Sequence, residues 1–344
     1  MGSPAPSRNP AIDWIKGWMI LCIVLVHTWA FPKIKFYLAV DVFFFISGYY
    51  LMLSFLRKPT TTVRYTWKRI KTIALPFFIC LGFRFLITPS QFITVDGLDH
   101  FIDSFTESFY TITFAEELGL EVSSEGICIG SWYFSVLIIS SFLLYGMLEF
   151  NQKLSTRVIF PLLAVIGFNM LIVHSDSFSS WTRVGALGFP LLRGFIEMTA
   201  GAPICSVYQE NRMAFERHPI FINAMGIIAF LLFTLLMFAQ QNYDKYLIIT
   251  IPWFLLAAVS ESSWLSSVLN HIHGGVMARI GQYTLYILCV HWPILIIVHW
   301  CNEHLFGLSL SGIRLAVVCI LALIPTTIVL TLLCKWIQRR LSNR

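Results

Sequence analysis

The first apolar segment of the chain carries a lysine and a histidine on one helical stripe. Lys16 and His27 are eleven residues apart, close to three helical turns, so both side chains project from one face about 16 Å apart along the axis. An ionisable side chain inside a membrane segment is costly and by default marks a functional site. We interpret the pair as a cation that holds an anionic substrate and a proton acceptor that does chemistry farther along the helix.

A carboxylate in the next apolar segment is placed to assist that histidine. Asp41 is expected at about the same depth as His27, because segments joined by a short connection tend to be neighbours. A carboxylate beside a histidine fixes its tautomer and stabilises the imidazolium, which makes a general-base pair. The alternative is a structural hydrogen bond, and we favour the catalytic role because Lys16 shares the stripe. Asp13, one turn before Lys16, is expected to pair with it or to cap the helix.

The composition is that of a membrane protein. The 344 residues are 57% hydrophobic and 12% charged, whereas soluble domains average about 25% charged residues. The net charge of +6 does not indicate nucleic-acid binding, because most basic residues flank apolar segments. The eight cysteines form no Cys-x-x-Cys pair and lie mostly in apolar runs, so we expect packing roles and no metal site.

Ten apolar runs are long enough to cross a bilayer, which takes roughly 17 to 25 residues. They are residues 12–31, 36–56, 70–88, 131–149, 158–174, 187–208, 219–239, 244–260, 281–300 and 313–335. The basic stretch from Arg57 to Lys71 places the connection after the second run in the cytoplasm. Alternation then predicts an all-α polytopic protein with about ten transmembrane helices and both termini cytoplasmic.

This topology predicts one membrane domain. Residues 1–11 are expected to be a cytoplasmic tail, 12–335 a single ten-helix domain, and 336–344 a basic cytoplasmic tail. Residues 89–130 contain no lysine or arginine and are expected to form an extracytoplasmic loop that could cover the outer mouth. The expected location is the plasma or inner membrane.

Several further side chains are candidates for substrate binding. Arg84 and Arg193 fall in the outer halves of their segments and could bind an oxyanion, or could equally form interhelical ion pairs, with Glu197 one turn from Arg193. Lys68 and Arg69 belong to the cytoplasmic basic stretch, which sets topology and could also attract an anionic cytosolic cofactor.

Three residues remain as candidates for the reaction itself. Ser47 and Tyr133 could stabilise an oxyanion, as could Arg84, although Tyr133 also fits the aromatic belt of a membrane protein. His291 lies mid-membrane beside Pro293, which breaks the local backbone ladder. Such a break is tolerated only where the freed groups find partners, so His291 is a candidate for the site lining.

Three elements, in order, resemble the acyltransferase-three family of integral membrane acyltransferases. Asp-x-x-Lys-Gly at 13–17 followed by His27 resembles its Arg-x10-His signature, with Lys16 in place of arginine. Residues 39–49, Ala-Val-Asp-Val-Phe-Phe-Phe-Ile-Ser-Gly-Tyr, resemble its Gly-Val-Asp-Leu-Phe-Phe-x-x-Ser-Gly-Phe element. Residues 280–286 with His-Trp-Pro at 291–293 resemble its late Ser-x-x-Tyr-x-x-x-x-His-x-Pro element. In addition to these three, the basic stretch before Pro76 resembles the family's Arg-x-x-Arg-x-x-Pro element.

The resemblance implies a ten-helix enzyme that moves an acyl group, usually acetyl, from cytosolic acyl-CoA to a hydroxyl of an extracytoplasmic glycan or lipid-linked sugar. Acyl-CoA would be a co-substrate, and no permanently bound cofactor is expected. Lys16 offers a point charge where arginine offers a bidentate fork, which weakens its grip on phosphate without removing it. The competing class is a transporter or glycan flippase that uses intramembrane His, Asp and Arg as a substrate or proton path. The sequence leaves open whether the chain acts alone or as a homodimer.

Overall fold

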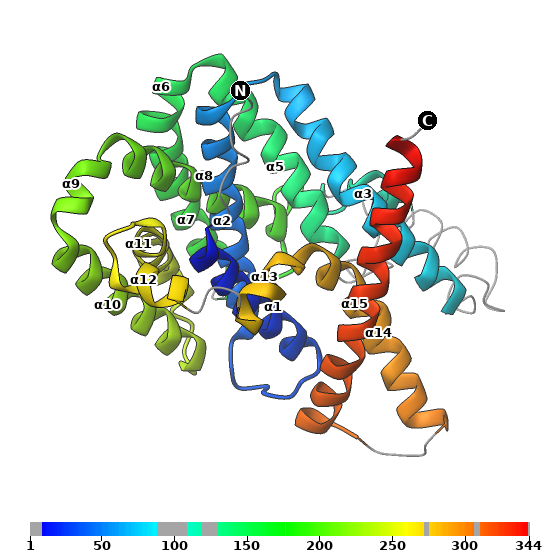
Figure 1. Cartoon of the computed structure of the whole chain (residues 1–344). Coiled ribbons are helices and arrows are strands. Elements are labelled where there is room, and N and C mark those ends of the chain that lie inside the picture. The colour runs from blue at the N-terminus through cyan, green and yellow to red at the C-terminus, as the bar shows by residue number, and fades with distance from the viewer. Residues whose placement is uncertain are drawn as a thin grey trace.

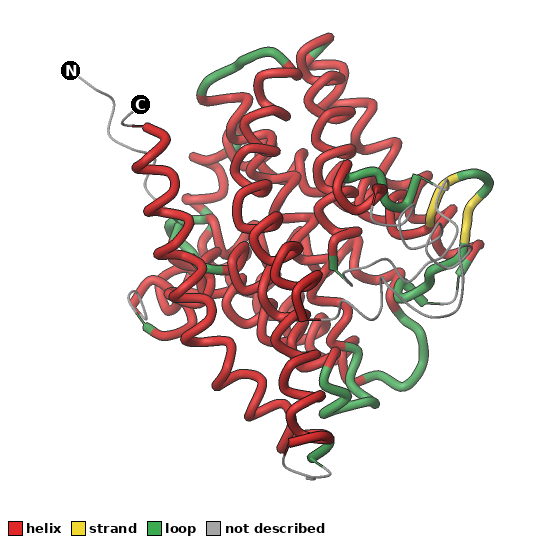
Figure 2. The backbone as a smooth tube through the Cα atoms, turned by 90° about the vertical axis from the view of Figure 1, so that its right-hand side faces the viewer, coloured by secondary structure: helices red, strands yellow, loops and turns green. Residues whose placement is uncertain are grey.

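The computed structural model describes residues 9–87, 109–118, 130–175, 177–271, 275–305 and 310–342, and within them almost all regular structure is helical (Figure 1). The exception is one antiparallel pair of two-residue strands, Arg183–Val184 (β1) and Leu187–Gly188 (β2), with Arg183 opposite Gly188. Figure 2 shows this pair on the side of the molecule opposite the C-terminal end of the chain.

The described residues form α-helices together with several short 3-10 or π-helical segments. In chain order they are α1 (Pro10–His27), η1 (Phe36–Leu38), α2 (Ala39–Arg57), α3 (Thr62–Ile87), α5 (Ser131–Phe150), α6 (Gln152–Leu154), η3 (Ser155–Ile159), α7 (Phe160–His174), α8 (Phe189–Glu210), α9 (Arg212–Arg217), α10 (Pro219–Phe238), η4 (Asp244–Tyr246), α11 (Leu247–Val259), α12 (Trp264–His271), α13 (Val276–Gln282), α14 (Thr284–Trp300), η5 (Cys301–Leu305) and α15 (Gly312–Ser342).

Each of the ten predicted apolar segments overlaps at least one of these helices. Six helical segments of the described chain are long and apolar enough to cross a membrane, and they are Pro10–His27, Phe36–Arg57, Ser131–Phe150, Gln152–His174, Pro219–Phe238 and Gly312–Leu341. The pair α13 and α14, bent by 84° at Tyr283, makes a seventh if it is one span. The protein is therefore an all-α membrane protein, as the sequence predicts. The remaining segments coincide with α3, α8 and α11, of 26, 22 and 13 residues.

Local chemistry fixes where α1 begins. The side chain of Asn9 accepts hydrogen bonds from the backbone N–H groups of Ala11 and Ile12, at 3.0 and 3.2 Å. Pro10 occupies the first helical position, where its missing N–H costs nothing. The helix then runs unbroken to His27 in its last turn, so the register between Lys16 and His27 is set within one element.

Two pairs of helices approach each other at glycines that permit no side chain. A Cβ on Gly17 of α1 would lie 2.0 Å from the carbonyl oxygen of Met277, and one on Gly281 of α13 would lie 1.7 Å from that of Asp13. On α2 and α8, a Cβ on Gly48 or Gly201 would lie 2.1 Å from a carbonyl oxygen of the facing helix. Each crossing therefore holds two backbones in direct contact, and α1 and α2 carry most of the predicted chemistry.

Only part of the predicted outer loop lies within the described residues. Residues 109–118 pack against the bundle: Phe114 contacts Phe77 of α3, with ring centroids 5.0 Å apart, and the carbonyl of Glu117 accepts the N–H of Gly188 at 3.0 Å. Residues 88–108 and 119–129 lie outside the described part, so the proposed cover over the outer mouth stays a prediction.

Candidate active site

A cavity of about 260 Å³ lies among α1, α2, α3, α5 and α14. Among the predicted residues, the lining includes Lys16, His27, Ser47, Arg69, Tyr133 and His291. Most of the remaining lining is apolar, with side chains such as Ile23, Phe43 and Leu288. A narrow apolar space with a few polar groups is typical of a small-molecule site.

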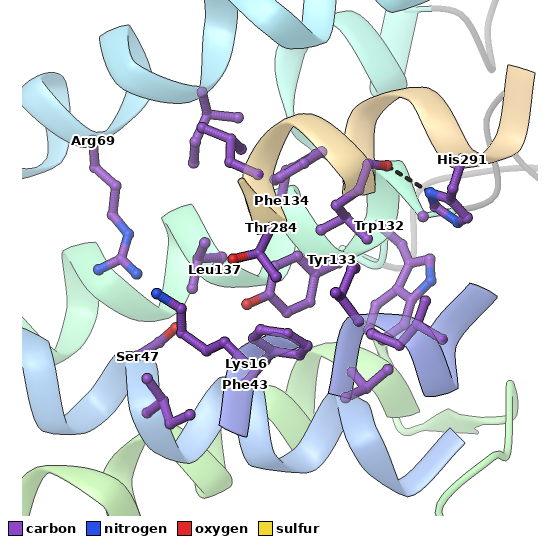
Figure 3. Close-up of a pocket in the computed structure, with 18 of the residues that line it drawn as sticks. Lys16, Phe43, Ser47, Arg69, Trp132, Tyr133, Phe134, Leu137, Thr284 and His291 are labelled. Carbon is purple, nitrogen blue, oxygen red and sulfur yellow. Dashed lines mark hydrogen bonds between the residues drawn. The ribbon is translucent and has the colours of Figure 1, made fainter. Parts of the chain in front are cut away.

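The two kinds of polar side chain gather at opposite ends of this cavity. Figure 3 shows Lys16 and Arg69 on one side and His291 on the other, with Tyr133 and Thr284 between them. The Nζ of Lys16 donates to Asp13 Oδ1 at 2.7 Å, as expected from their spacing, and Arg69 Nη1 donates to Tyr65 Oη at 2.9 Å. One end of the cavity is therefore cationic, and the other end holds histidine side chains.

His27 and His291 face each other at that other end. Their ring centroids are 5.4 Å apart, and the ring of Trp292 lies edge-on to His27 at 5.5 Å. His291 is 1% exposed, and its Nδ1 lies 2.7 Å from the carbonyl oxygen of Leu288. A carbonyl only accepts, so Nδ1 carries the hydrogen and Nε2 is left as an acceptor. That Nε2 has no hydrogen-bond partner among the described residues.

Asp41 requires a correction, because the structure pairs its carboxylate with Arg193. Arg193 Nε donates to Asp41 Oδ1 at 2.9 Å, and Nη2 donates to Oδ2 at 2.6 Å. Both groups are buried, and Asp41 is absent from the cavity lining. The bidentate pair occupies both carboxylate oxygens across α2 and α8, so the predicted pairing of Asp41 with His27 is replaced by an interhelical ion pair.

Arg193 makes two further buried contacts besides its pair with Asp41. Its Nε also lies 3.2 Å from Glu197 Oε1, the expected one-turn neighbour, and its Nη1 donates to the carbonyl of Phe178. Of the two predicted roles for Arg193, substrate binding and ion pairing, the contacts are those of the second. A buried guanidinium with this many acceptors fixes α8 against α2.

Two other basic candidates also lie away from the cavity. Lys68 is exposed on α3, while its neighbour Arg69 points into the cavity, because adjacent residues face about 100° apart on a helix. Arg84 is buried in α3 but is not among the lining residues. Neither side chain is placed to touch a ligand in this cavity.

Sequence reasoning missed two positions that shape the site, Gly130 and Thr284, and a third, Asp244, that joins distant segments outside the cavity lining. Gly130 precedes α5 with φ +109°, and a Cβ there would lie 3.3 Å from His291 Cε1. Thr284 begins α14 and lines the cavity beside Tyr133. Asp244 accepts from Lys35 Nζ at 3.3 Å, Tyr37 Oη at 2.9 Å and the N–H of Phe178 at 2.9 Å. Neither the positive φ of Gly130 nor the set of hydrogen-bond partners around Asp244 can be predicted from the neighbouring sequence.

A family model described as an acyltransferase domain matches residues 9–336. The chain belongs to the acyltransferase-three family. No curated protein and no solved structure matches the chain. In this acyltransferase, the three sequence elements that carried the resemblance meet at one place, since the cavity lining draws on residues 16–27, 40–50 and 284–291.

A resident metal has no visible site in the part of the acyltransferase that the structure describes. No group of three or more His, Cys, Asp or Glu side chains is arranged there to hold an ion. The seven cysteines within that part are free thiols, six of them buried, consistent with packing roles.

Proposed function

We propose that this acyltransferase moves an acetyl group, or another short acyl group, from cytosolic acyl-CoA to a hydroxyl of an extracytoplasmic glycan or lipid-linked sugar. The observation that carries this proposal is the polarity of the cavity, which has Lys16 and Arg69 at one end and two histidines at the other. The coenzyme is polyanionic at its nucleotide end and carries the thioester at the end of an extended arm. A cavity with a cationic end and, well apart from it, an end that holds two histidines complements such a molecule.

The cationic end supports binding of the coenzyme phosphates. Arg69 belongs to the basic stretch that the charge distribution places in the cytoplasm, and exposed Lys68 lies next to it. Arg69 can hold a phosphate through two N–H groups, while Lys16 supplies a point charge that is shared with Asp13. We assign coenzyme binding to Lys16 and Arg69, with Lys68 adding to the positive potential at the mouth.

The histidine end supports proton transfer. His27 takes the proton of the acceptor hydroxyl, its oxygen forms a bond to the thioester carbonyl carbon, and the carbon–sulfur bond breaks. The departing thiolate then takes the proton from His27, so the products are an ester and free coenzyme A. The hydroxyls of Tyr133 and Ser47 line the cavity and are candidates to donate to the oxyanion that forms on the carbonyl oxygen.

The proposal includes a topology. Ten membrane helices formed by a single domain of residues 12–335, with both termini cytoplasmic, put the cationic end of the cavity on the cytosolic side of a plasma or inner membrane. His27, in the last turn of α1, then lies toward the outer face, where a glycan would enter. Residues 89–130 would lie outside, and the tails 1–11 and 336–344 inside.

Thiol release from acetyl-CoA, by purified protein in lipid nanodiscs supplied with envelope glycan, tests the proposal. We expect wild-type release to be lost in His27→Ala. His174→Ala is the matched control, because His174, like His27, lies in the last turn of an apolar helix, α7, but is exposed. An equal rate in His27→Ala would contradict the proposal. Absence of both release and coenzyme binding would favour a transporter, the competing class of protein.

A further inference from the structure

We infer that His291 is the positioning residue of His27: its Nε2 accepts a hydrogen bond from the His27 ring and thereby directs the other His27 nitrogen at the acceptor hydroxyl. The inference rests on the proposed role of His27 as the base. It gives His291 the function that the sequence assigned to Asp41, whose carboxylate is held by Arg193.

His291 presents one defined acceptor. Its Nδ1–H is anchored to the carbonyl of Leu288 at 2.7 Å, which fixes the tautomer and leaves a lone pair on Nε2. The ring is 1% exposed, and Nε2 is buried without a partner among the described residues. Leaving a buried acceptor unsatisfied costs about 1–3 kcal/mol, so such an atom calls for a donor.

His27 is in ring contact with His291 and can supply that donor. The centroids of the two imidazoles are 5.4 Å apart, which lets a nitrogen of one reach a nitrogen of the other across a hydrogen bond of about 3 Å after a small ring rotation. Trp292 packs edge-on against His27 and limits its other orientations. The other titratable groups that line the cavity are Lys16, Arg69, Tyr50 and Tyr133, from α1, α3, α2 and α5.

The start of α5 indicates which of the two histidines takes the proton. Gly130 caps that 20-residue helix without a side-chain hydrogen bond, and a Cβ on Gly130 would lie 3.3 Å from His291 Cε1. His291 therefore sits against the positive end of a helix dipole, which opposes a charge on its own ring. The proton of the hydroxyl consequently goes to His27, while His291 stays neutral and accepts from it.

The proton balance is simple. The free nitrogen of His27 receives the hydroxyl proton, and its other N–H stays bonded to His291 Nε2. The new carbon–oxygen bond forms, the carbon–sulfur bond breaks, and the thiolate leaves with the proton from His27. His291 ends as it began, so it acts through His27 and makes no bond to substrate.

Two complementary variants separate this role from a structural one. The short amide in His291→Asn can keep the bond to Leu288 but removes the acceptor that faces the cavity, whereas His291→Gln places an amide oxygen near the Nε2 position. We expect His291→Asn to lower kcat at least tenfold with an unchanged KM for acetyl-CoA and an altered pH dependence of kcat. We expect His291→Gln to recover several-fold of that loss.

Substitutions at glycine provide a test that leaves His291 itself intact. Gly130→Ala should push the His291 ring aside and lower kcat in the same way. The control is Gly185→Ala, because Gly185 also has a positive φ, +64°, but has nothing within 4 Å of its added Cβ. We expect Gly185→Ala to keep the wild-type kcat.

The outcomes distinguish this inference from the proposed function. If thiol release depends on His27 but His291→Asn keeps the wild-type kcat and pH profile, the role of His291 is refuted while the acyltransferase proposal stands. Equal losses in His291→Asn and His291→Gln would also refute it, because the acceptor would then be irrelevant. If thiol release does not depend on His27, the proposed function itself is refuted. Coenzyme binding in each variant reports whether it is folded.

Discussion

Lys16 and His27 line one cavity from opposite ends of α1. Their separation of eleven residues places both on the same stripe of a continuous helix, about 16 Å apart. The cation near the amino-terminal end and the base near the carboxyl-terminal end are thus held at a fixed spacing. A substrate that spans both must be extended, with its anionic part and its reactive part well separated.

Removing the cation should weaken coenzyme binding without stopping turnover. In Lys16→Met, we expect the Kd for acetyl-CoA to rise about tenfold, equivalent to about 1.4 kcal/mol, with kcat little changed. The matched control is Lys153→Met, since Lys153 is exposed on α6 and lies outside the cavity lining. Titration calorimetry in nanodiscs measures this difference. Unchanged affinity in Lys16→Met would remove Lys16 from the coenzyme site.

Breaking the Asp41–Arg193 pair should affect stability rather than chemistry. Asp41→Asn removes one of the two carboxylates that pair with the buried guanidinium of Arg193, and breaking a buried ion pair costs about 3–5 kcal/mol. We expect a large drop in the midpoint of thermal unfolding, while the folded fraction keeps the pH dependence of kcat. A wild-type unfolding midpoint combined with a changed pH profile would return Asp41 to the role of orienting His27.

The contact between α1 and α13 should not tolerate a methyl group. In Gly281→Ala the new Cβ would overlap the carbonyl oxygen of Asp13, and backbone atoms yield only by moving the helices apart. We expect a loss of on the order of 1–3 kcal/mol in stability and a higher Kd for acetyl-CoA, because Lys16 shifts with α1. Gly82→Ala on α3 is the control, since nothing lies within 4 Å of its added Cβ. Equal behaviour of the two variants would show that the crossing is not tight.

Glu216, which lies outside the membrane helices, should make the stability of the protein depend on pH. Burial acts to raise the pKa of Glu216, but hydrogen bonds from Ser262, Tyr208 and the Glu261 backbone outweigh it and lower the pKa below its ordinary value of 4.5. A lowered pKa stabilises the folded state above the ordinary value, and this contribution is lost as pH falls through the folded-state pKa. Glu216→Gln should therefore lower the unfolding midpoint at pH 7, with the difference shrinking toward acid. A difference that is constant with pH would contradict this.

The sequence alone predicts features that depend on a single helix or a single apolar run. The register of Lys16 with His27 needs only helical geometry, and the helical membrane class follows from hydropathy. The basic stretch was enough to make Arg69 a candidate for binding an anionic cofactor, but the rotation of Arg69 toward the cavity, and that of Lys68 away from it, depends on how α3 packs.

Partner choice among buried charges could not be predicted in the same way. Asp41 is close in sequence to His27, yet it pairs with Arg193, 152 residues away, because α2 and α8 meet at Gly48 and Gly201. The sharp bend between α13 and α14 at Tyr283 was likewise not predicted, because the apolar run at 281–300 covers α14 but leaves most of α13 outside it. Both features arise from contacts between distant segments.

The most direct test of the account is transfer of a labelled acetyl group across a sealed vesicle that contains the protein in one orientation. Labelled acetyl-CoA is supplied only on the side of the basic connection between α2 and α3, and a glycan acceptor only on the other side. The account predicts that the acceptor gains the label with wild-type protein and with His174→Ala, and gains none with His27→Ala. Label transfer that persists in His27→Ala would contradict the central claim that chemistry occurs at the histidine end of this cavity.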